Sequence, residues 1–104
     1  YQGAVGGDVS EEEGYDAARI CAINALGALQ GALGDLDRIQ QVVKLLGFVA
    51  SAPGFHRQPF VINGASDFLV DVFGDKGRHA RSALGTSVLP FNIPVEIEFI
   101  VEIS

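Results

Sequence analysis

The most regular alternation of apolar and polar positions lies near the end of the chain, in residues 95–103. Every odd-numbered residue from Val95 to Ile103 is apolar, whereas Glu96, Glu98 and Glu102 fall on the opposite face. A period of two along the chain is typical of a half-buried β-strand. The pattern therefore predicts a strand over residues 95–103, with one face in the core and an acidic second face.

A second extended run covers His79–Val88, and a short proline-bracketed turn separates it from residues 95–103. This run consists mainly of small and apolar residues, with Arg81 as its one arginine. If the two runs pair as neighbouring strands, Arg81, Glu96 and Glu98 can meet on one surface of the sheet. No other constellation in the sequence has a comparable chemical role.

Apolar residues recur every three or four positions in two other segments, which predicts two helices. The first begins at a capping box, with Ser10 as N-cap and Glu13 three residues later, and runs to about Leu33. The second begins at Pro59, which suits the first turn of a helix, and ends at Gly74. The core face of the first helix is mostly alanine, which predicts a close approach to its neighbour. It comprises Ala18, Cys21, Ala22, Ala25, Ala28, Leu29 and Ala32.

Between the two helices, Ile39–Ala50 has the pattern of a long strand whose middle is apolar on both faces. Strands with two apolar faces are typical of the centre of a sheet that is covered on both sides. The order helix, strand, helix, strand, strand predicts an α+β domain with both helices on one face of the sheet. The opposite face then needs another cover, most simply a second subunit, so we expect an oligomer.

Composition and charge narrow the function classes. The 104 residues predict a single domain, residues 1–104. The net charge of −6 and the lack of a basic stripe argue against nucleic acid as the main partner. No apolar run is long enough to span a membrane and no signal peptide is evident, so we expect a cytoplasmic protein without a membrane partner. Because the chain starts at Tyr1 and contains no methionine, we also expect that it lacks its natural beginning.

Several short motifs occur in a fixed order along the chain. They are Asn24-Ala25-Leu26, Gly34-Asp35-Leu36-Asp37-Arg38-Ile39, Val42-Val43-Lys44, His79-Ala80-Arg81-Ser82-Ala83, Leu89-Pro90 and Val95-Glu96-Ile97-Glu98. Together they resemble the RidA/YjgF family, the reactive intermediate deaminases that are also described as endoribonuclease L-PSP-like proteins, across residues 8–104. Residues 34–39 and 49–59 are most similar to a longer, less characterised branch of that family.

The resemblance implies a chorismate-mutase-like fold, with two helices on one face of a mixed sheet, assembled as a homotrimer around a barrel-like core. It also implies cofactor-free hydrolysis of small 2-imino acids to 2-keto acids and ammonia, in clefts between subunits. Arg81 would bind the substrate carboxylate, and Glu96 would position the attacking water. Ser82, Ala83 and Asn63 would lie beside the substrate. Many members carry cysteine where this chain has Ala83, and the family's first strands, which supply a tyrosine and backbone groups, are not present in this sequence.

The residues themselves leave alternatives open for each role. A guanidinium donates two parallel hydrogen bonds to a carboxylate, so Arg81 suits a small acid, but it equally suits a salt bridge to Glu96 or Glu98. Asn63 suits a ligand role or that of a satisfied polar residue. Three functions remain: an imine deaminase, a non-catalytic module that binds a small carboxylate metabolite, and, from the family's older name, an RNA-cleaving enzyme.

The remaining reactive side chains predict no additional site. Cys21 lies in an apolar helical stripe without an activating base, so we expect a packed core thiol. His56 and His79 are the two histidines, and neither belongs to a metal-binding pattern. We therefore expect neither a metal nor a cofactor.

Overall fold

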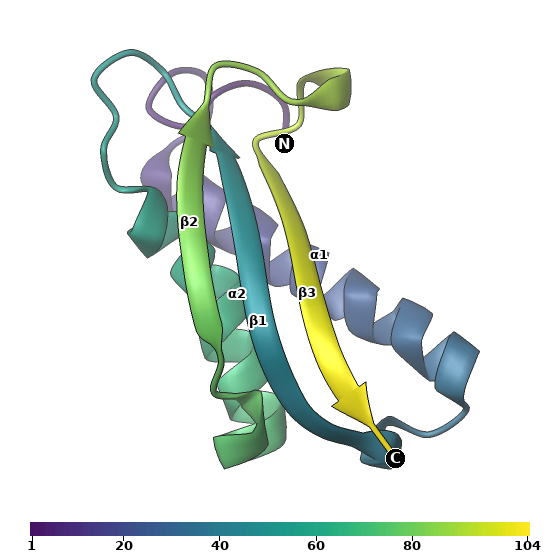
Figure 1. The fold of residues 1–104 in the computed structure, drawn as a ribbon. Helices are drawn as coiled ribbons and strands as arrows, with labels where there is room; N and C mark the ends of the chain where they lie inside the picture. Colours follow the sequence, from purple (N-terminus) through teal and green to yellow (C-terminus); the bar gives the residue numbers. More distant parts are fainter.

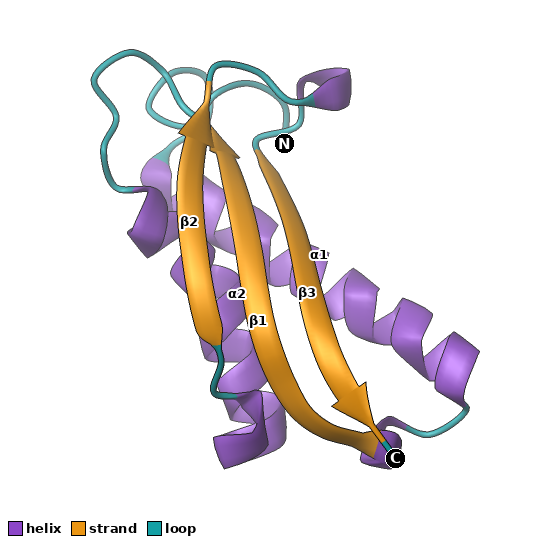
Figure 2. Ribbon diagram, in the orientation of Figure 1, coloured by secondary structure: helices purple, strands orange, loops and turns teal.

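The computed structural model describes residues 1–104 and shows a three-stranded sheet with two long helices behind it (Figure 1). In chain order the main elements are α1 (Glu11–Leu33), β1 (Ile39–Ala50), α2 (Gln58–Phe73), β2 (Ala80–Thr86) and β3 (Val95–Ile103). Three short 3-10 helices connect them, η1 (Leu36–Arg38), η2 (Gly74–Gly77) and η3 (Pro90–Asn92). Both helices cover the same face of the sheet (Figure 2), so the predicted α+β class and layer arrangement are confirmed.

The sheet has the order β2-β1-β3, with β1 parallel to β2 and antiparallel to β3. The sheet is therefore mixed, and α2 forms the crossover that a parallel pair such as β1 and β2 requires. The expectation that the last two strands pair with each other is wrong. β1 lies between them, because this long apolar strand takes a partner on each edge.

The central strand carries the middle of the core. Val42, Leu45 and Val49 are fully buried beneath the two helices. Ala18 and Ala22 of α1 are fully buried as well, so the first half of the predicted alanine-rich face is confirmed. The prediction is wrong for Ala28 and Ala32, which are exposed because the last turns of α1 extend beyond the core. Small side chains on α1 allow α2 to pack closely against it.

The helices begin and end as the local sequence predicts. At the start of α1, the Ser10 hydroxyl accepts a hydrogen bond from the Glu13 backbone N–H at 3.1 Å, and the Glu13 carboxylate accepts one from the Ser10 N–H at 2.9 Å. The hydrogen bonds from Ser10 lower the pKa of Glu13. The capping box is therefore formed with both of its reciprocal bonds, and it sets the start of α1.

The face of the sheet opposite the helices is open in the single chain. We call it the open face; its apolar members are Leu46, Phe48, Leu84 and Ile100. Leu84 and Ile100 expose 49% and 60% of their surface, and Leu46 and Phe48 are half-buried. An apolar surface of this extent on a small domain is typical of an interaction site.

Candidate functional site

Arg81 lies on the helix-covered face of β2, at the edge of the sheet. In the parallel register it is opposite Leu45, which is fully buried under the helices. Its side chain reaches α2, where Nη1 donates a hydrogen bond to Asn63 Oδ1 at 2.6 Å and one to Ser66 Oγ at 3.3 Å. The guanidinium is exposed, so it sits at the seam between α2 and β2 with access to solvent.

The two acids expected beside Arg81 lie on the other face of the sheet. Glu96 is opposite Phe48, and Glu98 is opposite Leu46. Both positions are out of phase with Leu45, so Glu96 and Glu98 belong to the open face. The expected meeting of Arg81 with these acids on one surface is therefore wrong within a single chain, because the side-chain alternation of β2 and β3 relative to β1 places them on opposite sides.

Arg81 has no acidic partner. The ion pairs of the structure are Arg57 with Glu11 and Arg78 with Asp75, so the alternative of a salt bridge from Arg81 to Glu96 or Glu98 is also wrong within a single chain. Only Nη1 is engaged, and its two acceptors are neutral side chains. The edge formed by Nε and Nη2 carries donors without a partner. That edge has the geometry to bind a carboxylate through two parallel hydrogen bonds, which makes Arg81 a candidate anion ligand.

Two further residues, Ser66 and His79, belong to the cluster around Arg81 and Asn63, and the sequence patterns did not indicate either of them as a site residue. His79 Nε2 lies 2.9 Å from Ser66 Oγ, and His79 Nδ1 lies 2.5 Å from the Gly77 carbonyl oxygen. The signal that could have found them is spacing: Asn63 and Ser66 are three apart on α2, and His79 and Arg81 are two apart on an extended segment. We call Asn63, Ser66, His79 and Arg81 the polar seam.

The remaining predicted contact residues divide between the two faces of β2. Ser82 is opposite Leu46 and lies on the open face, away from the Arg81 side chain. Ala83 is opposite Gly47 on the helix-covered face, where it is half-buried against the core. Asn63 holds Arg81 directly, so it is a satisfied polar residue whose partner is the candidate anion ligand.

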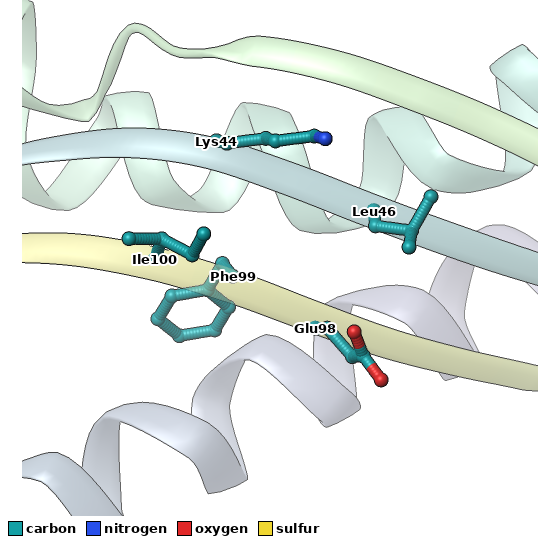
Figure 3. Close-up of a pocket in the computed structure, with 5 residues that line it drawn as sticks. All are labelled: Lys44, Leu46, Glu98, Phe99 and Ile100. Atoms are coloured by element: carbon teal, nitrogen blue, oxygen red, sulfur yellow. The ribbon is translucent and has the colours of Figure 1, made fainter.

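A shallow hollow on the open face lies between β1 and β3 (Figure 3). Lys44 and Glu98 project from neighbouring strands, with Leu46 and Ile100 beside them. Phe99 is opposite the buried Leu45 and packs against the core on the helix side. Lys44 and Glu98 form no ion pair. The open face thus combines exposed apolar groups with Lys44 and with the acids Glu96 and Glu98.

Other reactive groups lie outside the polar seam. Cys21 is half-buried near Tyr1, Ile93 and Pro94, its thiol is 4.0 Å from the Val95 carbonyl oxygen, and burial raises the pKa of the thiol. No group of three or more His, Cys, Asp or Glu side chains comes together in a way that could hold a metal ion. Neither helix is long and apolar enough to cross a membrane.

Comparison with known proteins agrees with the fold and with the motifs. Residues 1–103 match the family model described as "YjgF/chorismate_mutase-like, putative endoribonuclease". Protein TCP17 of Trypanosoma cruzi is 48% identical over 103 residues, which are 98% of this chain and 64% of that protein. The chain belongs to the YjgF/chorismate mutase-like family, and the resemblance noted in the sequence is confirmed.

Two solved structures are close in both sequence and fold. The crystal structure of Atu1372 from Agrobacterium tumefaciens, described as a protein with unknown function, superposes with a TM-score of 0.97 at 51% identity; the match covers 100% of this chain and 66% of that one. A structure described as a putative endoribonuclease from Shewanella oneidensis superposes with a TM-score of 0.95 at 36% identity, over 99% of this chain and 68% of that one. The chain thus spans about two thirds of the length of these relatives.

Proposed function

We propose that this chain is the ligand-binding domain of a hydrolase that converts small 2-imino acids to 2-keto acids and ammonia. The observation that carries the proposal is the Nε–Nη2 edge of Arg81, which has no partner and which neutral groups hold in place. A 2-imino acid has a carboxylate next to its imine carbon. Docking the carboxylate on Arg81 would therefore fix the position of the carbon that reacts.

The proposed reaction adds one water and releases one ammonia. Water attacks the imine carbon, the nitrogen takes up protons, and the resulting carbinolamine loses ammonia to leave the ketone. Glu96 would orient the water as a hydrogen-bond acceptor. This acid lies across the sheet from Arg81, so it can reach a ligand on Arg81 only where two copies of the chain meet. The proposal therefore includes a site between subunits.

The homotrimer is the second part of this proposal, and the open face would form its buried core. Replacing Ile100 with glutamate would place a charge in that core, so we expect a shift from a particle of about three times 11.0 kDa toward the single chain. Sedimentation velocity measures the shift. The control is Val72→Glu, a similarly exposed residue on α2, which should leave the assembly unchanged. A wild-type protein that sediments as a monomer would contradict the trimer.

An imine assay tests the chemistry. An amino-acid oxidase generates 2-iminopropanoate from alanine, and semicarbazide traps the remaining imine; active protein should reduce the trapped product. We expect Glu96→Gln to lower the rate of imine loss by about 100-fold, which is the lower end of the contribution that a general acid or base makes to a reaction rate. The matched control is Glu98→Gln, on the same face two residues later, which should keep most of the rate. Equal rates with and without wild-type protein would overturn the deaminase assignment.

A non-catalytic module for a small carboxylate metabolite is the second candidate. It is favoured by the free Nε–Nη2 edge of Arg81, which could bind a carboxylate without any contribution from Glu96. Binding of 2-ketobutyrate without any imine hydrolysis would support it.

RNA cleavage, which the family description names, is the third candidate function. A net charge of −6 counts against RNA cleavage. This function would be revived if the protein cleaved a single-stranded RNA and the Arg81→Ala variant cleaved it equally well.

A further inference from the structure

The hydrogen bonds of the polar seam define which nitrogen of His79 carries its proton. The Gly77 carbonyl oxygen can only accept, so at 2.5 Å from Nδ1 it requires a proton on that nitrogen. In the neutral ring Nε2 is then an acceptor. The group 2.9 Å from Nε2 is the Ser66 hydroxyl, which must donate its proton to the ring.

This arrangement also fixes the orientation of the Ser66 hydroxyl. With its proton turned toward His79, Ser66 Oγ offers only lone pairs to Arg81, whose Nη1 donates to it at 3.3 Å. Asn63 Oδ1 is the second acceptor on the same Nη1. With the opposite tautomer of His79, a lone pair would face the Gly77 carbonyl oxygen, and the hydroxyl proton would be free to turn toward the guanidinium.

We propose that Ser66 and His79 are positioning residues for the carboxylate site: His79, held by Gly77, orients the Ser66 hydroxyl so that two acceptors anchor Nη1 of Arg81 and its Nε–Nη2 edge faces the ligand. This inference rests on the proposed role of Arg81 as the carboxylate ligand. Neither residue touches the reacting atoms. They already restrict the long Arg81 side chain, so this side chain loses less conformational entropy when a ligand binds.

A serine beside an imidazole also has the composition of a nucleophile with its base, but the surroundings favour positioning. Ser66 lies in the middle of α2, is half-buried, and its oxygen accepts from Arg81. A nucleophile needs an approach path for a carbonyl carbon at its oxygen, and His79 Nε2 and Arg81 Nη1 already lie beside Ser66 Oγ. Labelling of Ser66 by a serine-directed fluorophosphonate would overturn the positioning role.

Two replacements of His79 separate positioning from packing. Glutamine can place its amide oxygen near the position of Nε2 and still accept from Ser66, whereas asparagine is too short to do so. We expect His79→Asn and Ser66→Ala to raise the Kd for 2-ketobutyrate, measured by calorimetry, about 5-fold to 10-fold, within the range for one lost hydrogen bond. His79→Gln should stay within about twofold of the wild type by the same measure. His56→Asn, which alters the exposed histidine outside the seam, is the control.

Imidazole ¹⁵N NMR of the intact wild-type protein tests the geometry without reference to activity. We expect the Nδ1–H tautomer at His79; the Nε2–H tautomer would overturn the inference. Unchanged 2-ketobutyrate affinity in a folded His79→Asn variant would also overturn it, and the proposed function would survive if Arg81→Ala still lost binding. If Arg81→Ala binds as well as the wild type, the proposed function fails, and the positioning role fails with it even if the tautomer is as expected. Backbone NMR spectra of each variant verify folding.

Discussion

Replacing Arg81 with alanine should weaken binding of 2-ketobutyrate by about 10-fold to 100-fold, the range for one hydrogen bond to a charged group. The reason is geometric: Nη1 is held by Asn63 and Ser66, so Nε and Nη2 are presented without a competing carboxylate. Arg81→Lys should fall between the wild type and Arg81→Ala, because an ammonium keeps the charge and loses the planar pair of donors. Isothermal titration calorimetry measures the three affinities.

A second arginine on the same segment gives the matched control. Arg78 is exposed, and its only ionic partner is Asp75, itself almost fully exposed. Exposed pairs of this kind contribute little, so Arg78→Ala removes the same positive charge from the surface with little effect on stability. We expect it to leave 2-ketobutyrate affinity unchanged. Equal losses in Arg78→Ala and Arg81→Ala would mean that net charge, not the geometry of the polar seam, attracts the ligand.

Replacing Gly64 with alanine should destabilise the protein by about 3 kcal/mol or more, at the upper end for overpacking, because the clash is with backbone. A Cβ at Gly64 would collide with the Tyr15 carbonyl oxygen of α1 and lie 3.2 Å from the backbone nitrogen of Arg19. Relief requires the two helices to move apart. Urea unfolding followed by circular dichroism measures the stability.

The same substitution elsewhere on a helix should have the opposite sign. Gly27 lies in α1, and a Cβ added there would have no neighbouring atom within 4 Å, so alanine at this position meets only solvent. Gly27→Ala should stabilise the protein by about 0.5–1 kcal/mol, the difference in helix propensity between the two residues. A Gly64→Ala protein as stable as Gly27→Ala would show that the helices are not held as closely as the structure indicates.

The elements and their boundaries follow from the order of the amino acids alone. β1 and β3 cover the predicted residues 39–50 and 95–103, and α1 starts after the predicted cap Ser10. These features are local: alternation, apolar runs and a capping box act over a few neighbouring residues. Arg81 also stands out as a candidate anion ligand without knowledge of its neighbours, because an arginine is unusual in a strand of small and apolar residues.

Which residues share a face became visible only in the folded chain. A period of two separates the two faces of each strand, but it does not say which face of β2 lies on the same side as which face of β3. The answer depends on the register of β2 and of β3 with β1. These registers place Arg81 on the helix-covered face of the sheet and Glu96 on the open face. The contact of Ser66 with His79 likewise arises from the close packing of α2 against β2, since hydrogen bonds between segments distant in sequence leave no periodic signal in either.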